Sequence, residues 1–470
     1  MFRKKSFYIT TTLPYVNAEP HIGFAYEIVL ADVLARYKKS QGDDVFFNTG
    51  TDEHGQKIFN AAEKSGEKVA DYVNRYAKEF QKLKELLGLS GDLKFIRTTE
   101  ERNKAAAEEL WRRCQKDIYE KEFEGLYCVG CERFLSERDI SDGKCVIHQT
   151  EPQALKEKNW FFKFSKYEKD LLKYLENKNS IIPDWRMEEA INFVNEGLED
   201  FSISREKSRL SWGVPVPGDN TQVMYVWFDA LTNYISTLGW PEDKNGDFKK
   251  FWEEGVTLQV AGKDQVRFQS LMWQAMLMSA GIKNTDQIFY HGFINSGGQK
   301  MSKSLGNVIS PYDMVKRYGV DGTRYLLLRH VNPFEDTDVT WEKLDEWYEA
   351  GLANGLGNLT ARIMKMAGDY LNSPVSVNNK GTQVNTKTID EFNFQEALGL
   401  VFAAIGLLDG EIQNKKPWET KDKKVITKLV TELAQIASDL TPFLPETSEK
   451  ILKAIKDNKK PENLFPRLNA

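Results

Sequence analysis

The chain has 470 residues, enough for about three domains of roughly 150 residues each, and 41% of the residues are hydrophobic. This apolar content supports several packed cores and excludes a disordered or fibrous protein. Lys and Arg number 64 against 69 Asp and Glu, and the resulting net charge of -5 excludes a globally positive surface, so any RNA contact must be local.

No segment of the sequence has the pattern of a membrane span or of a signal peptide. The longest apolar stretch, Ala397 to Leu408, is well short of the roughly 20 residues that cross a bilayer. The basic residues Arg3 to Lys5 precede only the short apolar stretch Phe7 to Ile9, after which three threonines follow. We therefore expect a cytoplasmic protein with no membrane partner.

The first part of the chain alternates apolar strands with helices. Phe7 to Thr10 predicts a strand, Glu27 to Arg36 lies in a predicted helix, and Asp44 to Thr49 predicts a second strand. Thr51-Asp52-Glu53-His54-Gly55 follows this second strand. Polar residues therefore gather just beyond strand ends, where open α/β sheets bind ligands.

This alternation is interrupted once and then returns. Tyr127 to Glu151 is rich in Cys, Gly and charge, and Asn159 to Trp185 carries aromatics and lysines, so we predict an inserted domain in this region. Further strands of the sheet are predicted at Met224 to Phe228, Val256 to Ala261 and Ile288 to Phe293. From Trp341 onward only helical periodicity is found, which predicts a helix bundle.

The strongest chemical signal is a cluster of thiols in the predicted insertion. Cys128 and Cys131 are followed, after thirteen intervening residues, by Cys145 and His148. Three thiolates and one imidazole are the ligands of a closed, structural zinc site. A disulfide is the alternative, but a cytosolic chain keeps its thiols reduced, and pairing would leave one cysteine over. Cys114 is predicted to be a packed helix residue.

Two motifs suit phosphate chemistry. Pro20-His21-Ile22-Gly23 lies at the start of the first predicted helix, where free amides and the helix dipole favour an anion, and Gly23 lets a planar base approach the backbone. Lys300-Met301-Ser302-Lys303-Ser304 follows Gly297-Gly298, and its two lysines can neutralise a polyphosphate on a loop that closes. A helix-capping histidine is the alternative for His21.

The motifs together resemble the class I aminoacyl-tRNA synthetases, and within them the methionine-specific enzymes. The resemblance covers essentially the whole chain and rests on these segments: Leu13-Pro14-Tyr15 with Asn17, Pro20 to Gly23, Thr51 to Gly55, Val226 to Ala230, Gly262 to Asp264, and Lys300 to Ser304. It implies an α/β fold with a Rossmann-type parallel sheet, split by a zinc-containing connective insertion and followed by an all-α helix bundle.

The resemblance also implies domain boundaries. The two halves of the Rossmann catalytic domain are expected at 1–115 and 224–295, with the connective insertion and its zinc knuckle at 116–223 between them. A linking domain with the Lys300-to-Ser304 loop is expected at 296–340, and an α-helical anticodon-binding domain at 341–470. No further domain is apparent after this bundle, so we expect a monomer.

The activity implied by the resemblance is ligation of methionine to its tRNA through a methionyl adenylate, with ATP, Mg²⁺ and one structural zinc. The expected partners are initiator and elongator tRNAs for methionine. The implied catalytic residues are His21, Lys300 and Lys303. The implied ATP-binding residues are His21, Gly23, Glu27, Gly262, Asp264, Lys300 and Lys303. The implied methionine-binding residues are Leu13, Tyr15, Asp52, Trp227, Ala230, Leu231, Tyr234, Phe268 and Gln269.

The residue types at these positions fit methionine and RNA chemistry. An unbranched thioether suits an adaptable aromatic wall, and the Asp52 carboxylate can hold the substrate ammonium; the alternative is that the aromatics are core residues. The resemblance assigns anticodon reading to Asn358, Arg362 and Trp418, through hydrogen bonds and stacking on unpaired bases. An ordinary bundle surface is the alternative for these three.

Two positions depart from the family pattern. Phe24 stands where the family usually has a second histidine, and Gln269 where it often has a pocket histidine. One alternative function is therefore a class I ligase for another amino acid, although 470 residues leave no space for a long editing insertion. The other is a synthetase-like tRNA-binding protein with weakened catalysis, which Phe24 favours and Asp52, Lys300 and Lys303 oppose.

Overall fold

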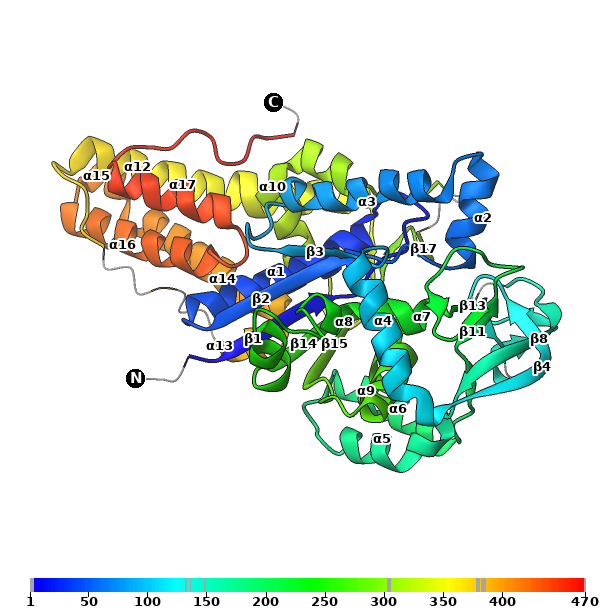
Figure 1. Ribbon diagram of the computed structural model, residues 1–470. Helices are drawn as coiled ribbons and strands as arrows, with labels where there is room; N and C mark the ends of the chain where they lie inside the picture. The colour runs from blue at the N-terminus through cyan, green and yellow to red at the C-terminus, as the bar shows by residue number, and fades with distance from the viewer. Residues whose placement is uncertain are drawn as a thin grey trace. The chain divides into compact units, whose positions relative to one another are not determined.

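The computed structural model describes residues 4–131, 133–135, 137–147, 149–301, 306–377, 381 and 386–468 (Figure 1). The chain forms two compact units, each assembled from separated stretches of sequence. Unit 1 comprises Met1–Glu19, Val45–Lys82 and Leu93–Tyr290. Unit 2 comprises Pro20–Asp44, Leu83–Asp92 and His291–Ala470.

Unit 1 is built around a six-stranded sheet with the strand order β3-β2-β1-β14-β15-β9. The strands are β1 Ser6–Thr11, β2 Asp44–Thr51, β3 Lys94–Arg97, β9 Ile181–Ile182, β14 Val256–Gly262 and β15 Gln287–His291. The pairs β1 with β14, β2 with β3, and β15 with β9 are parallel. Nearly every residue of β1 and β14 is buried, because both faces of a parallel sheet are covered. The predicted α/β fold with a parallel sheet is confirmed.

Helices and aromatic side chains fill the core beside this sheet. The helices between its strands are α2 Gln56–Ser65, α3 Val69–Leu86, α4 Glu101–Cys114, α5 Glu168–Leu175, α6 Asp184–Asn195, α7 Val226–Leu231, α8 Asn233–Ser236 and α9 Trp273–Ala280. Trp111, Trp252 and Trp273 are almost fully buried in the same core. Cys114 lies at the end of α4, also buried, and burial raises the pKa of its thiol to about 12, so its predicted packing in a helix is confirmed.

The strand predicted at Met224 to Phe228 is wrong. Met224 ends β13, Asp219–Met224, which belongs to a small antiparallel sheet, and helix α7 begins at Val226. A short, fully buried apolar run has no polar face to reveal its period, so the sequence alone does not separate a strand from a buried helix there.

The segment between α4 and α7 contains antiparallel sheets. Strand β4, Ile118–Cys128, pairs with β8, Gln153–Phe162, along nearly its whole length, in the order β10-β8-β4-β5. The remaining strands here are β5 Arg133–Phe134, β6 Ile140–Ser141, β7 Lys144–Cys145, β10 Phe201–Ser202, β11 Ser204–Glu206 and β12 Pro215–Val216. Antiparallel pairing needs no crossover helix, which is why the βα alternation disappears from this part of the sequence.

Unit 2 combines helix α1, Ile22–Ser40, with a three-stranded sheet and a helical C-terminal region. The sheet strands are β16 Ile294–Ser296, β17 Gln299–Lys300 and β18 Thr337–Val339. The later helices are α10 Pro311–His330, α11 Trp341–Tyr348, α12 Asn358–Tyr370, α13 Thr386–Asp390, α14 Phe394–Lys415, α15 Pro417–Thr420, α16 Lys423–Leu440 and α17 Pro445–Lys456, with a π-helical segment, Glu349–Gly357, before α12. The predicted helix bundle is confirmed. Within the described ranges, no helix has the length and apolar content to cross a bilayer.

A buried ion pair ties the separated stretches of unit 2 together. Nη2 of Arg324 on α10 lies 2.9 Å from Oδ2 of Asp32 on α1, and neither side chain is exposed. The Arg324 guanidinium also donates to the backbone oxygens of Leu87, Pro442 and Phe443. One cation thus contacts acceptors from three separate parts of the sequence.

Candidate functional site

The sheet of unit 1 has its switch point between β1 and β14. From β1 the chain continues to β2 on one side of it, and β14 pairs on the other side. Ligands of open α/β sheets bind outside the carboxyl ends of such strands. Leu13-Pro14-Tyr15 follows β1, and Gly262 ends β14 with Asp264 directly beyond it. The two predicted segments therefore lie at the position where this fold binds ligands.

Asp52 lies at the end of β2 and is joined to the segment after β1 by the backbone. Its N–H donates to the Pro14 oxygen at 2.9 Å, and its carbonyl accepts from Val16 at 3.2 Å, in a bridge that pairs Asp52 with Tyr15. The Asp52 side chain is buried, with 2% exposed. The bridge places Asp52 and Tyr15 next to each other in the backbone, and the Asp52 carboxylate accepts from the His54 N–H at 3.4 Å.

The predicted methionine-binding aromatics come together from three segments of unit 1. The ring of Trp227 stacks on that of Phe268, with centroids 4.0 Å apart, and meets the Tyr15 ring edge-on at 6.3 Å. Tyr234 accepts a hydrogen bond from the Gln269 amide at 2.5 Å. Ala230, Leu231, Tyr234 and Gln269 are buried, whereas Leu13, Tyr15, Trp227 and Phe268 are half-buried. The result is an apolar, aromatic wall with one amide within it.

Phe268 and Gln269 lie on a π-helical segment, Val266–Met272, that follows Asp264. The wider π-helical turn is a feature that proteins often place at functional sites. The Gln269 backbone oxygen accepts from the Gln274 amide, which fixes the turn against α9. The sequence pattern gave no sign of this local geometry.

A buried pair that spacing did not reveal locks the segment after β2 to α7. His54 Nδ1 and Asp229 Oδ2 are 3.0 Å apart, and both side chains are buried. The neighbouring Glu53 carboxylate accepts from Arg97 at 2.6 and 2.8 Å, and its backbone oxygen accepts from Trp212. These bonds hold Asp52 on one side and the α7 residues on the other in a fixed arrangement.

In unit 2, His21 is the N-cap of α1. Its Nδ1 accepts from the Gly23 N–H at 3.1 Å, so the neutral ring carries its proton on Nε2, where it is a hydrogen-bond donor. A Cβ at position 23 would lie 2.9 Å from the His21 ring, so any other residue there would push the ring away from this capping position. The capping interpretation of His21 is thus what the structure shows, and the cap leaves an exposed imidazole with a defined tautomer.

The start of α1 is bonded to the chain just after the lysine-rich loop. Ile22 N–H donates to the Ile309 oxygen at 3.1 Å, and Ser310 caps α10. Lys300 ends strand β17, while Lys303 lies outside the described residues, as does the Lys300 side chain. Within unit 2, the backbone therefore joins the start of α1 to the chain that follows the lysine-rich loop. Glu27, one turn further along α1, is buried beside His291.

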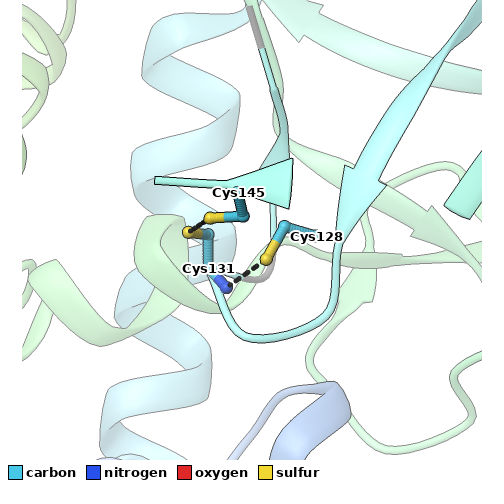
Figure 2. Close-up of side chains that lie close together, drawn as sticks. All are labelled: Cys128, Cys131 and Cys145. Carbon is cyan, nitrogen blue, oxygen red and sulfur yellow. Dashed lines mark hydrogen bonds between the residues drawn. The ribbon is translucent and has the colours of Figure 1, made fainter. Parts of the chain in front are cut away.

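The three predicted cysteine ligands meet in the small sheets of unit 1 (Figure 2). Their sulfur atoms all lie within 4.8 Å of one another, and Cys131 and Cys145 are 3.5 Å apart. A disulfide bond would be about 2.05 Å long, so these cysteines are not joined by a disulfide. Tetrahedral zinc with 2.3 Å bonds requires sulfurs about 3.8 Å apart. The cluster therefore fits zinc ligation; His148, the predicted fourth ligand, lies outside the described residues.

Two of the predicted anticodon residues are in contact. The Arg362 guanidinium of α12 lies over the Trp418 ring of α15, 5.7 Å from its centroid, and Trp418 is 37% exposed. Asn358 begins α12 and is exposed. Arg362 also donates to Asp409 at 2.6 Å, and the Gln413 amide would accept from it at 3.2 Å with its oxygen turned toward Arg362. Asp409 and Gln413 of α14 are neighbours of this site that sequence reasoning missed.

The sheet, its switch point and these motifs define a class of protein. The chain matches the family model "tRNA synthetases class I (M)" over residues 7–142 and 137–364. It belongs to the class I aminoacyl-tRNA synthetases, as the sequence resemblance implied.

Two bacterial methionine–tRNA ligases and a solved methionyl-tRNA synthetase structure are similar to this chain over nearly its whole length. Methionine–tRNA ligase of Fusobacterium nucleatum is 38% identical, covering 98% of this chain and 76% of that protein. The ligase of Nostoc sp. is also 38% identical, covering 96% and 90%. Among solved structures, Mycobacterium tuberculosis methionyl-tRNA synthetase in complex with methionyl-adenylate has a TM-score of 0.88 and 36% identity, covering 95% of this chain and 93% of that one.

Proposed function

We propose that this protein is an ATP-dependent ligase that activates methionine as an adenylate and transfers it to methionine-specific tRNA in the cytoplasm. The observation that carries the proposal is the Trp227–Phe268 stack with Tyr15 and Asp52 at the carboxyl ends of β1 and β2. Similarity to a structure that holds methionyl-adenylate supports it.

Methionine recognition is assigned to two kinds of group. The aromatic wall contacts the thioether, for which polarisable rings are favourable partners. The buried Asp52 carboxylate accepts hydrogen bonds from the substrate ammonium, and an ion pair in this apolar setting fixes its orientation. The hydrogen bond between Gln269 and Tyr234 joins two residues of the wall, and the Gln269 amide is a polar group that carries no charge.

Adenylate formation requires alignment of two reactants and stabilisation of phosphate charge. The methionine carboxylate attacks the α-phosphorus of ATP, and pyrophosphate leaves. His21, whose Nε2–H is a donor, is assigned to the phosphates together with Lys300 and Lys303. Gly23, Glu27, Gly262 and Asp264 are assigned to the adenosine part. Mg²⁺ accompanies ATP and offsets charge on the leaving oxygens.

The transfer step joins the adenylate to the ribose hydroxyl of the terminal adenosine of tRNA. We assign recognition of the anticodon to the Arg362–Trp418 pair with Asn358, in the helical domain at 341–470. The insertion at 116–223 lies between the catalytic halves at 1–115 and 224–295, and the linking domain is at 296–340. No further chain is needed for this assignment, so we propose a monomer.

Amino-acid-dependent exchange of pyrophosphate into ATP tests the proposed function directly. The assay is run with each of the twenty amino acids in turn, and methionine alone is expected to support exchange. Activity with a different amino acid would identify a class I ligase of other specificity. No exchange with any of them would favour the synthetase-like tRNA-binding protein that Phe24 suggests.

Zinc is assigned to Cys128, Cys131, Cys145 and His148, as one structural ion per chain. Cys145→Ala is expected to lower the zinc content measured by elemental analysis to well below one per chain, and to impair exchange through loss of structure. Cys114→Ala is the matched control, because Cys114 lies in α4 outside the cluster, and it should retain zinc. Wild-type protein purified without chelator and found free of metal would contradict the assignment.

Trp418→Ala is expected to reduce tRNA charging by about tenfold, because a base–aromatic stack contributes roughly 1–3 kcal/mol. Pyrophosphate exchange needs no tRNA and should stay near the wild-type rate. Trp185→Ala is a matched control, since Trp185 is a similarly exposed tryptophan in unit 1. Equal losses in both assays would indicate a folding defect, and undiminished charging would make Trp418 an ordinary surface residue.

A further inference from the structure

Unit 2 contains a buried acid–base pair at the start of the proposed ATP-binding helix. His291 is the last residue of β15, and its Nε2 lies 3.0 Å from Oε2 of Glu27 on α1. The two side chains are only 6% and 5% exposed. Their positions are 264 residues apart in the sequence, so the fold alone brings them together.

The hydrogen bonds of His291 fix where its protons are. Nδ1 lies 2.8 Å from the backbone oxygen of Gly292, and a carbonyl oxygen only accepts, so Nδ1 carries a proton. A neutral ring would then have a bare Nε2 facing a carboxylate oxygen, and two acceptors do not approach to 3.0 Å. The pair therefore holds one more proton than a neutral histidine and an ionised Glu27 would. Either His291 is an imidazolium, or Glu27 donates to it.

The surroundings hold the His291 ring in this orientation. The Tyr26 ring meets it edge-on, with centroids 5.4 Å apart. A Cβ on Gly292 would lie 2.2 Å from the backbone of Glu335, so the chain passes Glu335 too closely for any other residue. Phe293 N–H donates to Asp336 at 2.9 Å and fixes the next residue. The backbone that follows His291 is therefore held in place, and the Tyr26 ring contacts the imidazole.

We propose that His291 is a positioning residue for ATP, which acts by holding the Glu27 carboxylate through this shared proton. The inference rests on the proposed function, in which Glu27 contacts the adenosine part of ATP. A carboxylate suits the two vicinal hydroxyls of a ribose, because each hydroxyl donates to it. Glu27 must point in one direction to do this, and the His291 contact removes its rotational freedom.

Two substitutions separate this role from simple packing. In His291→Gln, the side-chain amide nitrogen of glutamine takes the place of the histidine Nε2. This variant therefore keeps a hydrogen-bond donor toward Glu27. In His291→Asn, the shorter side chain places its amide nitrogen only where the histidine Nδ1 was. This variant therefore keeps the hydrogen bond to Gly292 and loses the contact with Glu27. In pyrophosphate exchange, His291→Asn is expected to raise KM for ATP about tenfold, the size of a lost charge-assisted hydrogen bond, with KM for methionine unchanged. His291→Gln should stay within about threefold of wild type.

Equal effects of the two variants, no effect of either, or an equal rise in KM for methionine would overturn the proposal. The chain has 5 histidines, so ¹⁵N-histidine spectra assigned by loss of a signal in His291→Gln give a second measurement. A protonated Nδ1 is expected, and a ring with a bare Nδ1 would also overturn it. Wild-type protein that supports no exchange with any amino acid would instead refute the proposed function, without bearing on the spectra.

Discussion

Replacing either Lys300 or Lys303 by alanine is expected to slow methionine-dependent pyrophosphate exchange by 100-fold or more. The negative charge that these lysines oppose develops on the phosphates only as the adenylate forms. Removal of one such group typically costs about 3 kcal/mol of transition-state stabilisation. Methionine binding precedes this charge development, so the dissociation constant for methionine should change by less than about threefold, a split typical of a group acting in the transition state.

The control for these variants is a lysine of unit 2 that is remote in sequence from the loop. Lys450 of α17 forms an exposed pair with Glu446, and exposed pairs contribute about 0–1 kcal/mol. Lys450→Ala should therefore leave exchange and stability near the wild-type values. Unchanged exchange in both loop variants would remove these lysines from the catalytic assignment, and an equal loss of methionine binding would indicate damage to the fold.

Features carried by short stretches of sequence could be predicted. The strands at Phe7 to Thr10 and Val256 to Ala261 are found at β1 and β14, because each is an apolar run flanked by turns. The cysteine cluster was predictable because Cys128, Cys131 and Cys145 lie within eighteen positions. Local spacing determines these elements, and no tertiary contact has to be known in advance.

Features that depend on distant contacts could not be predicted. His54 meets Asp229 across 175 residues, and Glu27 meets His291 across 264, so neither partner shows a spacing pattern. The β9 strand at Ile181–Ile182 has only two residues and lies within the range predicted for the insertion, although it pairs with β15 of the main sheet. Such pairs form only when parts of the chain that are distant in the sequence fold against each other.

The candidate site residues also divide into those that the sequence identifies and those that only the folded structure reveals. The resemblance selected Trp227 and Phe268, and the structure shows why those two positions act together, because their rings stack. It selected Arg362 without the α14 residues that hold it. Asp409 and Gln413 lie on α14, and their relation to Arg362 arises only because the fold brings these side chains of α14 to that of Arg362.

The buried Arg324–Asp32 pair leads to the largest expected effect on stability. Arg324→Ala removes the fully buried one of the two arginines that face the Asp32 carboxylate and leaves only the partly exposed Arg36. Breaking a buried pair typically costs about 3–5 kcal/mol in the free energy of unfolding. Urea unfolding measures this change. Lys39→Ala, which removes an exposed pair with Asp92 on the same α1, is the control and should cost less than about 1 kcal/mol.

The pH dependence of stability gives an independent check on the same pair. Burial raises the pKa of the Asp32 carboxyl, but the charges of Arg324 and Arg36, with hydrogen bonds from Arg36 and Ser90, outweigh it and hold this pKa below its usual value. Asp32 therefore binds its proton less tightly in the folded state. Its contribution to stability is complete above the unfolded pKa of about 3.9 and is lost as the pH falls through the lower folded value.

Arg324→Ala should remove most of this acid-dependent contribution together with the stability at neutral pH. A double variant, Asp32→Asn with Arg324→Ala, should be less destabilised than the sum of the two single variants, because the second substitution no longer strands a buried charge. Strict additivity would show that the two side chains do not interact. The Arg324 bonds to Leu87, Pro442 and Phe443 would then be what joins the separated stretches of unit 2.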